Sequence, residues 1–257
     1  MKFILFLTPL ALFAAAPAAQ FEVASVKVSG AESNGVRGGC HGIDSRTTPG
    51  EAAALVPLGR CVITDGRLSH LIGIAWNLPV QSIQGAPDWV IAGAERFTIE
   101  AKAEDPAATT EGQLLAMLRN LLIERFQMKF HLEDKQMQGF ALTIGKDGVK
   151  FRESKSEDTG VSFGNRAKPV LGAPITMVAR RQSMESLAKV LSLIGQMGPI
   201  TDQTGLAGFY DFRLAWDEAD GPLLSTALQE QMGLRLNKQQ VPVPQFMFEA
   251  AQRPGAN

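Results

Sequence analysis

Residues 128–144 read MKFHLEDKQMQGFALTI, and residues 234–250 read LRLNKQQVPVPQFMFEA. Large apolar residues alternate with polar ones near the start of each stretch and again near its end, which is the two-residue period of a strand with one buried face. Each stretch therefore predicts two short strands. The apolar residues of the two stretches correspond at one shared offset: Met128 with Leu234, Phe130 with Leu236, Phe140 with Phe246, and Leu142 with Phe248.

The segments that precede the two stretches follow one another in the same order. In the first half we expect, in turn, a strand over 21–28, a helix from Leu68, an alternating strand over 97–101 and a helix opened by the capping box of Thr110 and Gln113. In the second half we expect, in turn, a strand over 175–179, a helix capped by Ser183, an alternating strand over 210–216 and a helix with Pro222 in its first turn.

This shared order predicts an α+β fold of two tandem, similar βαββαββ-like units, each an antiparallel or mixed sheet with helices packed on one face. Consecutive strands near the end of each unit are expected to form antiparallel hairpins. The first unit covers residues 19–152 with a disulfide loop, a linker or long surface loop covers 153–172, and the second unit with a C-terminal tail covers 173–257. The simpler alternative is that any α+β chain offers such correspondences once gaps are allowed.

The first 18 residues have the features of a secretory signal peptide. Lys2 supplies a positive charge, an apolar run extends from Phe3 to Ala16, and small residues lead up to Ala18. The run is too short to span about 30 Å of hydrocarbon comfortably. We therefore expect cleavage after Ala18, export to the periplasm or out of the cell, and no membrane span in the mature chain.

The charge balance argues against nucleic acid as a partner. The chain has 25 Lys and Arg residues against 26 Asp and Glu residues, and removing residues 1–18 leaves 24 against 26, a net charge of −2. Binding to nucleic acid selects a basic surface. The expected partner is instead an unknown ligand or protein outside the cytoplasm.

Cys40 and Cys61 are the two cysteines of the chain. In an exported protein such an even pair predicts a disulfide, here closing a segment rich in Gly and Pro that we expect to be an irregular loop. The alternative is a metal site that uses His41. One Cys-His pair with one distant Cys lacks the paired spacing of a zinc site, so we expect neither a metal nor another cofactor.

No residue pattern assigns a catalytic residue. The histidines His41, His70 and His131 lack the spacing of a metal-binding motif. Ser69 and His70 with Asp65 lack the Gly-x-Ser-x-Gly elbow that exposes a nucleophile. Two carboxylates from distant parts of the chain could still meet for hydrolysis, beside aromatic residues that line a groove. The candidates are Glu22, Asp65, Asp88, Glu100, Asp202 and Asp211, with Trp76, Trp89 and Trp216.

The segment from Asp202 to Phe212 contains the candidate ligand-binding residues, which are Asp202, Thr204, Tyr210 and Asp211. Asp202 and Thr204 can bond the nearby backbone in an Asx-turn or ST-turn, and Gly205 and Gly208 can adopt positive φ. A structural turn is the simpler interpretation of this segment, and a binding role is its alternative.

Five stretches of the chain carry a family resemblance: Phe21–Lys27, Phe97–Ala103, Leu121–His131, Asp202–Phe212 and Thr226–Leu234. Together they resemble an exported soil-bacterial family of unknown function (domain of unknown function 3738), and they cover nearly the whole mature chain in order. The family is uncharacterised, so the resemblance implies no activity. In some relatives a similar domain follows a BlaR-type membrane metallopeptidase, which implies a sensing or binding role outside the cytoplasm.

Two classes of function follow from these observations. The first is a non-catalytic extracytoplasmic binding or interaction module. The second is a hydrolase that acts on a cell-envelope or environmental polymer through acidic residues. A deep cleft that joins acids and Trp residues would favour the hydrolase, whereas an apolar groove or an open sheet edge between the two units would favour the binding module.

Overall fold

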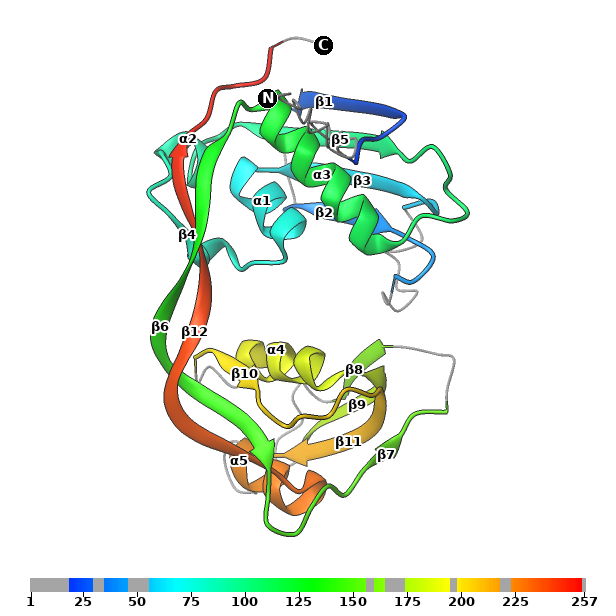
Figure 1. The fold of residues 1–257 in the computed structure, drawn as a ribbon, viewed down its shortest axis with the longest axis vertical. Helices are drawn as coiled ribbons and strands as arrows, with labels where there is room; N and C mark the ends of the chain where they lie inside the picture. The colour runs from blue at the N-terminus through cyan, green and yellow to red at the C-terminus, as the bar shows by residue number, and fades with distance from the viewer. Residues whose placement is uncertain are drawn as a thin grey trace, which may run out of the picture.

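Two long strands, β6 (Lys129–Ile144) and β12 (Leu234–Ala250), form an antiparallel ribbon through the molecule. Figure 1 shows that one end of this ribbon enters a first lobe and the other end enters a second lobe. The computed structural model describes residues 19–29, 35–45, 56–155, 160–164, 174–194, 198–217 and 223–255. The predicted signal peptide, residues 1–18, lies outside the described residues.

The first lobe is an antiparallel sheet with helices on one face (Figure 1). The strand order is β1 (Val23–Ser29), β5 (Arg96–Lys102), β3 (Arg60–Gly66) and β2 (Arg37–His41). Its helical segments are α1 (Leu68–Trp76), η2 (Val80–Ser82), α2 (Asp88–Ile91) and α3 (Glu111–Arg125). The predicted capping box opens α3, because the Gln113 N–H donates to the Thr110 hydroxyl oxygen and the Thr110 N–H donates to the Gln113 side chain.

The second lobe is also an antiparallel sheet with helices. Its strand order is β7 (Arg152–Glu153), β11 (Tyr210–Trp216), β9 (Ile175–Gln182) and β8 (Gly160–Gly164). Its helical segments are α4 (Met184–Ile194), α5 (Leu224–Ala227) and the π-turn η3 (Leu228–Met232). Ser183 caps α4 as predicted, since its hydroxyl oxygen accepts the Ser186 N–H at 3.1 Å.

The ribbon is the centre of a third sheet, with strand order β10-β6-β12-β4. In the first lobe, β4 (Ile83–Gln84) pairs in parallel with the end of β12 at Phe246 and Met247. In the second lobe, β10 (Ile200–Asp202) pairs in parallel with the end of β6 from Phe140 to Leu142. Each lobe is thus completed by a strand that starts in the other one. The α+β class predicted from the sequence is confirmed.

The predicted hairpins at the end of each unit are wrong. The two alternating segments in 128–144 belong to one strand, as do the two in 234–250. The intervening residues 133–138 include no Gly or Asn that would turn the chain back, and their backbone pairs with β12 instead. Their side chains are exposed, so a polar stretch between two apolar segments marks the part of the strand that crosses between lobes.

Apolar side chains anchor both ends of the ribbon. In the first lobe, the Phe130 and Phe246 rings stack at 4.3 Å, and the Trp76 ring meets each of them edge-on at 5.1 Å. In the second lobe, Leu142 and Leu234 are fully buried in the core. The ribbon therefore contributes to both hydrophobic cores.

The segment 153–172, predicted as a linker or long surface loop, contains strand β8 and the end of β7. Residues 156–159 and 165–172 lie outside the described part of the chain. Within the part that is described, no helix combines the length and the apolar character needed to cross a membrane.

The predicted disulfide joins Cys40 on β2 to Cys61 on β3, where the two residues face each other in the antiparallel register. The cysteines thus lie in paired strands and not in an irregular loop, while residues 46–55 between them lie outside the described residues. The Cys61 side chain is fully buried in the first core. The bond holds the edge strand β2 to the sheet.

We predict that replacing both cysteines by alanine lowers the free energy of unfolding by about 3 kcal/mol. Without the bond, which closes a loop across 21 residues, the unfolded chain has more conformational entropy. Urea unfolding of the oxidised wild type and the double variant measures this difference, and reductant should affect only the wild type. Alkylation of both cysteines in folded protein without reductant would show that the bond is absent.

Gly139 lies where the ribbon enters the second lobe. The Phe140 N–H donates to the Pro199 carbonyl oxygen at 2.9 Å, which draws the chain at Pro199 against the ribbon. A Cβ atom on Gly139 would overlap this carbonyl oxygen and the Val241 side chain. Glycine is therefore needed here for close approach of two backbones.

We predict that Gly139→Ala lowers the free energy of unfolding by about 1–3 kcal/mol, because the backbone at Pro199 has to move. The matched control is Gly112→Ala in α3, where the new methyl group meets nothing within 4 Å and helix propensity favours alanine by up to about 1 kcal/mol. Urea unfolding compares the two, and equal stability of both variants would contradict the role of Gly139.

Candidate functional site

The predicted turn after β10 is present. The Asp202 carboxylate accepts the Thr204 N–H at 2.9 Å and the Thr204 hydroxyl at 2.8 Å. The Thr204 hydroxyl oxygen in turn accepts the Leu206 N–H at 3.2 Å. Gly205 has φ of 72°, as expected for this turn. The polar atoms of Asp202 and Thr204 therefore hold the loop that leads to β11.

Gly208 does not have the positive φ predicted for it. Its role is close packing, since a Cβ atom there would lie 2.8 Å from the Tyr210 hydroxyl oxygen and 2.7 Å from a Glu153 carboxylate oxygen. The Tyr210 ring also meets the Phe151 ring edge-on at 5.3 Å. These contacts fix the start of β11 against β7.

Asp211 stabilises a bulge in β9. The register between β9 and β11 shifts beside Asp211, and Arg181 in the bulge has φ of 49°. The Asp211 carboxylate accepts the Arg181 N–H at 2.8 Å. A hydrogen bond from the Ser154 side chain, this Arg181 contact and the charge of Arg180 lower the pKa of Asp211, while burial opposes them. Asp211 is therefore held ionised as a structural group.

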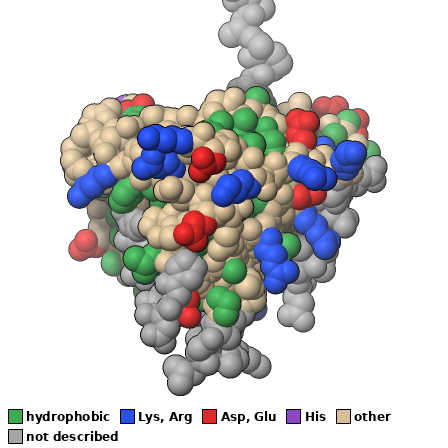
Figure 2. Space-filling view, turned by 90° about the horizontal axis from the view of Figure 1, so that it is seen from below, with side chains coloured by type: hydrophobic (Ala, Val, Ile, Leu, Met, Phe, Trp, Pro, Cys, Tyr) green, Lys and Arg blue, Asp and Glu red, His purple; other side chains and the backbone are tan. Residues whose placement is uncertain are grey.

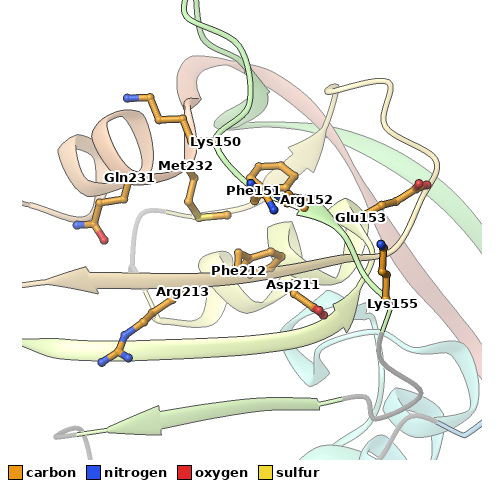
Figure 3. A pocket seen from close by; sticks show the side chains of 10 residues that line it. All are labelled: Lys150, Phe151, Arg152, Glu153, Lys155, Asp211, Phe212, Arg213, Gln231 and Met232. Atoms are coloured by element: carbon orange, nitrogen blue, oxygen red, sulfur yellow. The ribbon is translucent and has the colours of Figure 1, made fainter.

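A pocket of about 700 Å³ opens next to Asp211, between the chain at 150–155, strand β11 and the end of η3. Its apolar lining comes from Phe151, Phe212 and Met232. Figure 3 shows these three side chains in the middle of the pocket, with charged side chains spread around them. Of the four predicted site residues, Asp211 alone lines this pocket.

Four cations and two acids line the same pocket. The cations are Lys150, Arg152, Lys155 and Arg213, and the acids are Glu153 and Asp211. The Asp211 carboxylate is already engaged by the backbone, and the Glu153 carboxylate and the Arg213 guanidinium both point away from the centre (Figure 3). Figure 2 shows Lys and Arg side chains spread over this end of the molecule. The pocket is therefore locally basic on a chain of net charge −1.

Three of these cations form no ion pair with an acidic side chain in the described part of the chain. The Lys150 ammonium donates to the Glu230 carbonyl oxygen at 2.8 Å. Arg152, Lys155 and Arg213 are exposed, and none of them has an ion pair or a side-chain hydrogen bond with a residue in the described ranges. Their charges are available to a bound anion.

The sequence did not identify these cations as a site. Lys150, Arg152 and Lys155 lie close together in the chain, but Arg213 is on another strand. The pairing of β7 with β11, Glu153 with Tyr210 and Arg152 with Asp211, brings the two segments together. The sequence offered one signal for this site: polar residues alternate at Lys150 and Arg152 and again along β11. Such alternation does not specify which strands lie next to each other.

The other catalytic candidates are dispersed. Glu22 forms an ion pair with Lys102 at 2.8 Å, and Trp216 is buried in the second core. His131 is exposed and contacts Glu249 at 2.9 Å. In the described ranges, no three His, Cys, Asp or Glu side chains gather to hold a metal ion.

A second hollow of about 810 Å³ lies in the first lobe beside His70 and Asn77. Burial, followed by the charges of Arg67 and Arg96, lowers the pKa of His70. The His70 ring nitrogen Nδ1 accepts the Arg67 N–H at 3.3 Å, which caps the start of α1. His70 is therefore favoured in its neutral form as a helix cap.

The family model described as "Protein of unknown function (DUF3738)" matches residues 69–251 of the chain. Comparisons with curated proteins and with solved structures found no match. The matched region includes the ribbon, the whole second lobe as described and every residue that lines the basic pocket. The chain belongs to this family of proteins of unknown function, DUF3738.

Proposed function

We propose that this protein is a non-catalytic extracytoplasmic binding module whose second lobe takes an anionic ligand. The observation that carries the proposal is the set of three cations, Arg152, Lys155 and Arg213, which lack an anionic partner among the described residues. They line the same pocket as the apolar side chains of Phe151, Phe212 and Met232, so a ligand can gain both charge-assisted contacts and apolar burial.

The acids named for a hydrolase do not support that alternative. Of the six, only Asp211 lines the basic pocket, and its carboxylate accepts a backbone N–H there. General acid–base chemistry with carboxylates needs two of them facing the reacting bond. The pocket's other acid, Glu153, points away from its centre (Figure 3).

Binding outside the cytoplasm is supported by the predicted signal peptide and by the Cys40–Cys61 disulfide. We predict that the mature protein begins at or near Ala19, because small residues lead up to Ala18. Intact-mass analysis of protein from the periplasm and the medium tests this cleavage. Recovery there of a species that retains Met1 would contradict it.

The arrangement of elements supports two related units within the module. When the short segments η2, α2 and η3 are set aside, the elements follow the same order in both units, which is β3-α1-β4-β5-α3-β6 in the first and β9-α4-β10-β11-α5-β12 in the second. β4 pairs in parallel with β12, and β10 pairs in parallel with β6. The basic pocket is lined by β11 and η3 of the second unit together with the chain at 150–155, which precedes that unit. A duplicated unit with one specialised copy is the interpretation that we propose.

We predict that the double variant Arg152→Gln with Arg213→Gln weakens the binding of anions about tenfold or more, since two charge-assisted contacts are lost. NMR titration of the wild type with citrate and with tetraglutamate provides the measurement, and shifted amides should include those of Arg152 and Arg213. Binding should weaken as salt is added.

The matched control is Arg37→Gln with Arg60→Gln, which makes the same change in net charge at exposed positions of β2 and β3 in the first lobe. This control should bind both anions as the wild type does. Equal weakening in both double variants would show that only net charge matters. Failure of the wild type to bind either anion would overturn the proposal.

A further inference from the structure

The edge of β11 that faces the basic pocket is only partly covered. β7 pairs with β11 at Tyr210 and Asp211, and the Ser154 N–H donates to the Phe209 carbonyl oxygen at 2.7 Å. Further along, the side-chain amide of Gln231 bonds both the N–H and the carbonyl oxygen of Ala215, at 2.9 and 2.6 Å. Between these two covered positions lies Arg213.

The backbone of Arg213 faces the pocket. In an antiparallel sheet, alternate residues direct their N–H and C=O groups to the same neighbour. Phe209 and Ala215 form backbone hydrogen bonds on the pocket side of β11. Arg213 is an even number of residues from both, so its N–H and C=O groups point to the pocket side too. The strand containing β7 would continue to Lys150 opposite Arg213, but the Lys150 N–H donates to the Met232 carbonyl oxygen at 3.0 Å instead. In the described chain, nothing pairs with this edge position.

Gln231 shows what kind of group fits this edge. A side-chain amide has the same donor and acceptor as a peptide group, and at Ala215 it makes the two bonds that a neighbouring strand would make. A peptide group of a ligand at Arg213 would complete the edge between β7 and Gln231. The gap is one residue long, so the ligand is short.

The faces of β11 determine which side chains such a ligand would present. Phe212 and Leu214 are buried, whereas Arg213 is exposed on the opposite face. A ligand residue paired with Arg213 places its side chain on the same face as Arg213, while its two neighbours point towards the side of Phe212. An acidic residue between two apolar residues therefore fits the charge and the apolar lining of the pocket.

We propose that the basic pocket binds a short acidic peptide in extended form, with one ligand residue paired to the Arg213 backbone as an added strand segment. This inference rests on the proposed anion-binding function and specifies its ligand class. The ligand carboxylates lie against Arg152 and Arg213, and the flanking apolar side chains lie against Phe151 and Phe212. Main-chain pairing supplies affinity, and the cations select acidic ligands.

The test uses acetyl-Val-Glu-Val with a free carboxyl terminus and two N-methylated isomers of it. In an extended peptide, the N–H of the Glu faces Arg213, whereas the N–H groups of its neighbours face the other way. We expect N-methylation of the Glu to weaken binding at least tenfold, and N-methylation of the last Val to change it less than threefold. NMR titration of the full chain measures all three affinities.

Hydrogen exchange of the Arg213 amide is the second measurement. The parent peptide should slow this exchange, since the N–H becomes a donor to the ligand, and citrate should leave it unchanged. Equal affinity of the two N-methylated isomers, with Arg213 exchange unaffected, would overturn the peptide inference. In that case, a tenfold loss of citrate affinity in the double variant Arg152→Gln with Arg213→Gln would still support anion binding. Failure of the wild type to bind citrate, tetraglutamate and the peptides would overturn both proposals.

Discussion

The antiparallel pairing of β6 with β12 is the interaction on which both lobes depend. The pairing runs from Lys129 opposite Ala250 to Ile144 opposite Leu234. Each strand starts in one lobe and ends in the other, so neither lobe has a complete core without a segment from the far half of the chain. In the middle of the ribbon the side chains of residues 133–138 are exposed, Val241 on β12 is buried, and backbone hydrogen bonds join the two strands; apolar side chains fix both ends.

The ribbon is protected from further pairing along its middle. Pro242 and Pro244 alternate on β12, and a proline without an N–H is tolerated only where that group would face an open edge. The short strands β4 and β10 cover the edges only where the ribbon enters each lobe. Gly139 permits the close approach of Pro199 at one of these entries. Together these residues define where each lobe begins.

The basic pocket arises where two backbones diverge. β7 follows β11 for two pairs of residues, and then the chain at Lys150 turns its N–H towards Met232. The divergence leaves a gap over Phe212 and exposes the edge of Arg213. Cations from both sides of the gap then line one pocket, together with the carboxylates of Glu153 and Asp211. The cationic side chains and the open edge of β11 thus lie at the same place, which is the basis for proposing a peptide ligand there.

The sequence by itself determined the α+β class, the helix caps at Thr110 and Ser183, the turn at Asp202 and the pairing of the cysteines. These features depend on local hydrogen bonds, periodicity or a unique choice of partner. Only the tertiary structure decided that the alternating segments merge into two crossing strands and that Arg213 lies beside Arg152. Strand partners are chosen by contacts between residues far apart in the chain, and periodicity reports which face of a strand is buried but not which strand lies next to it.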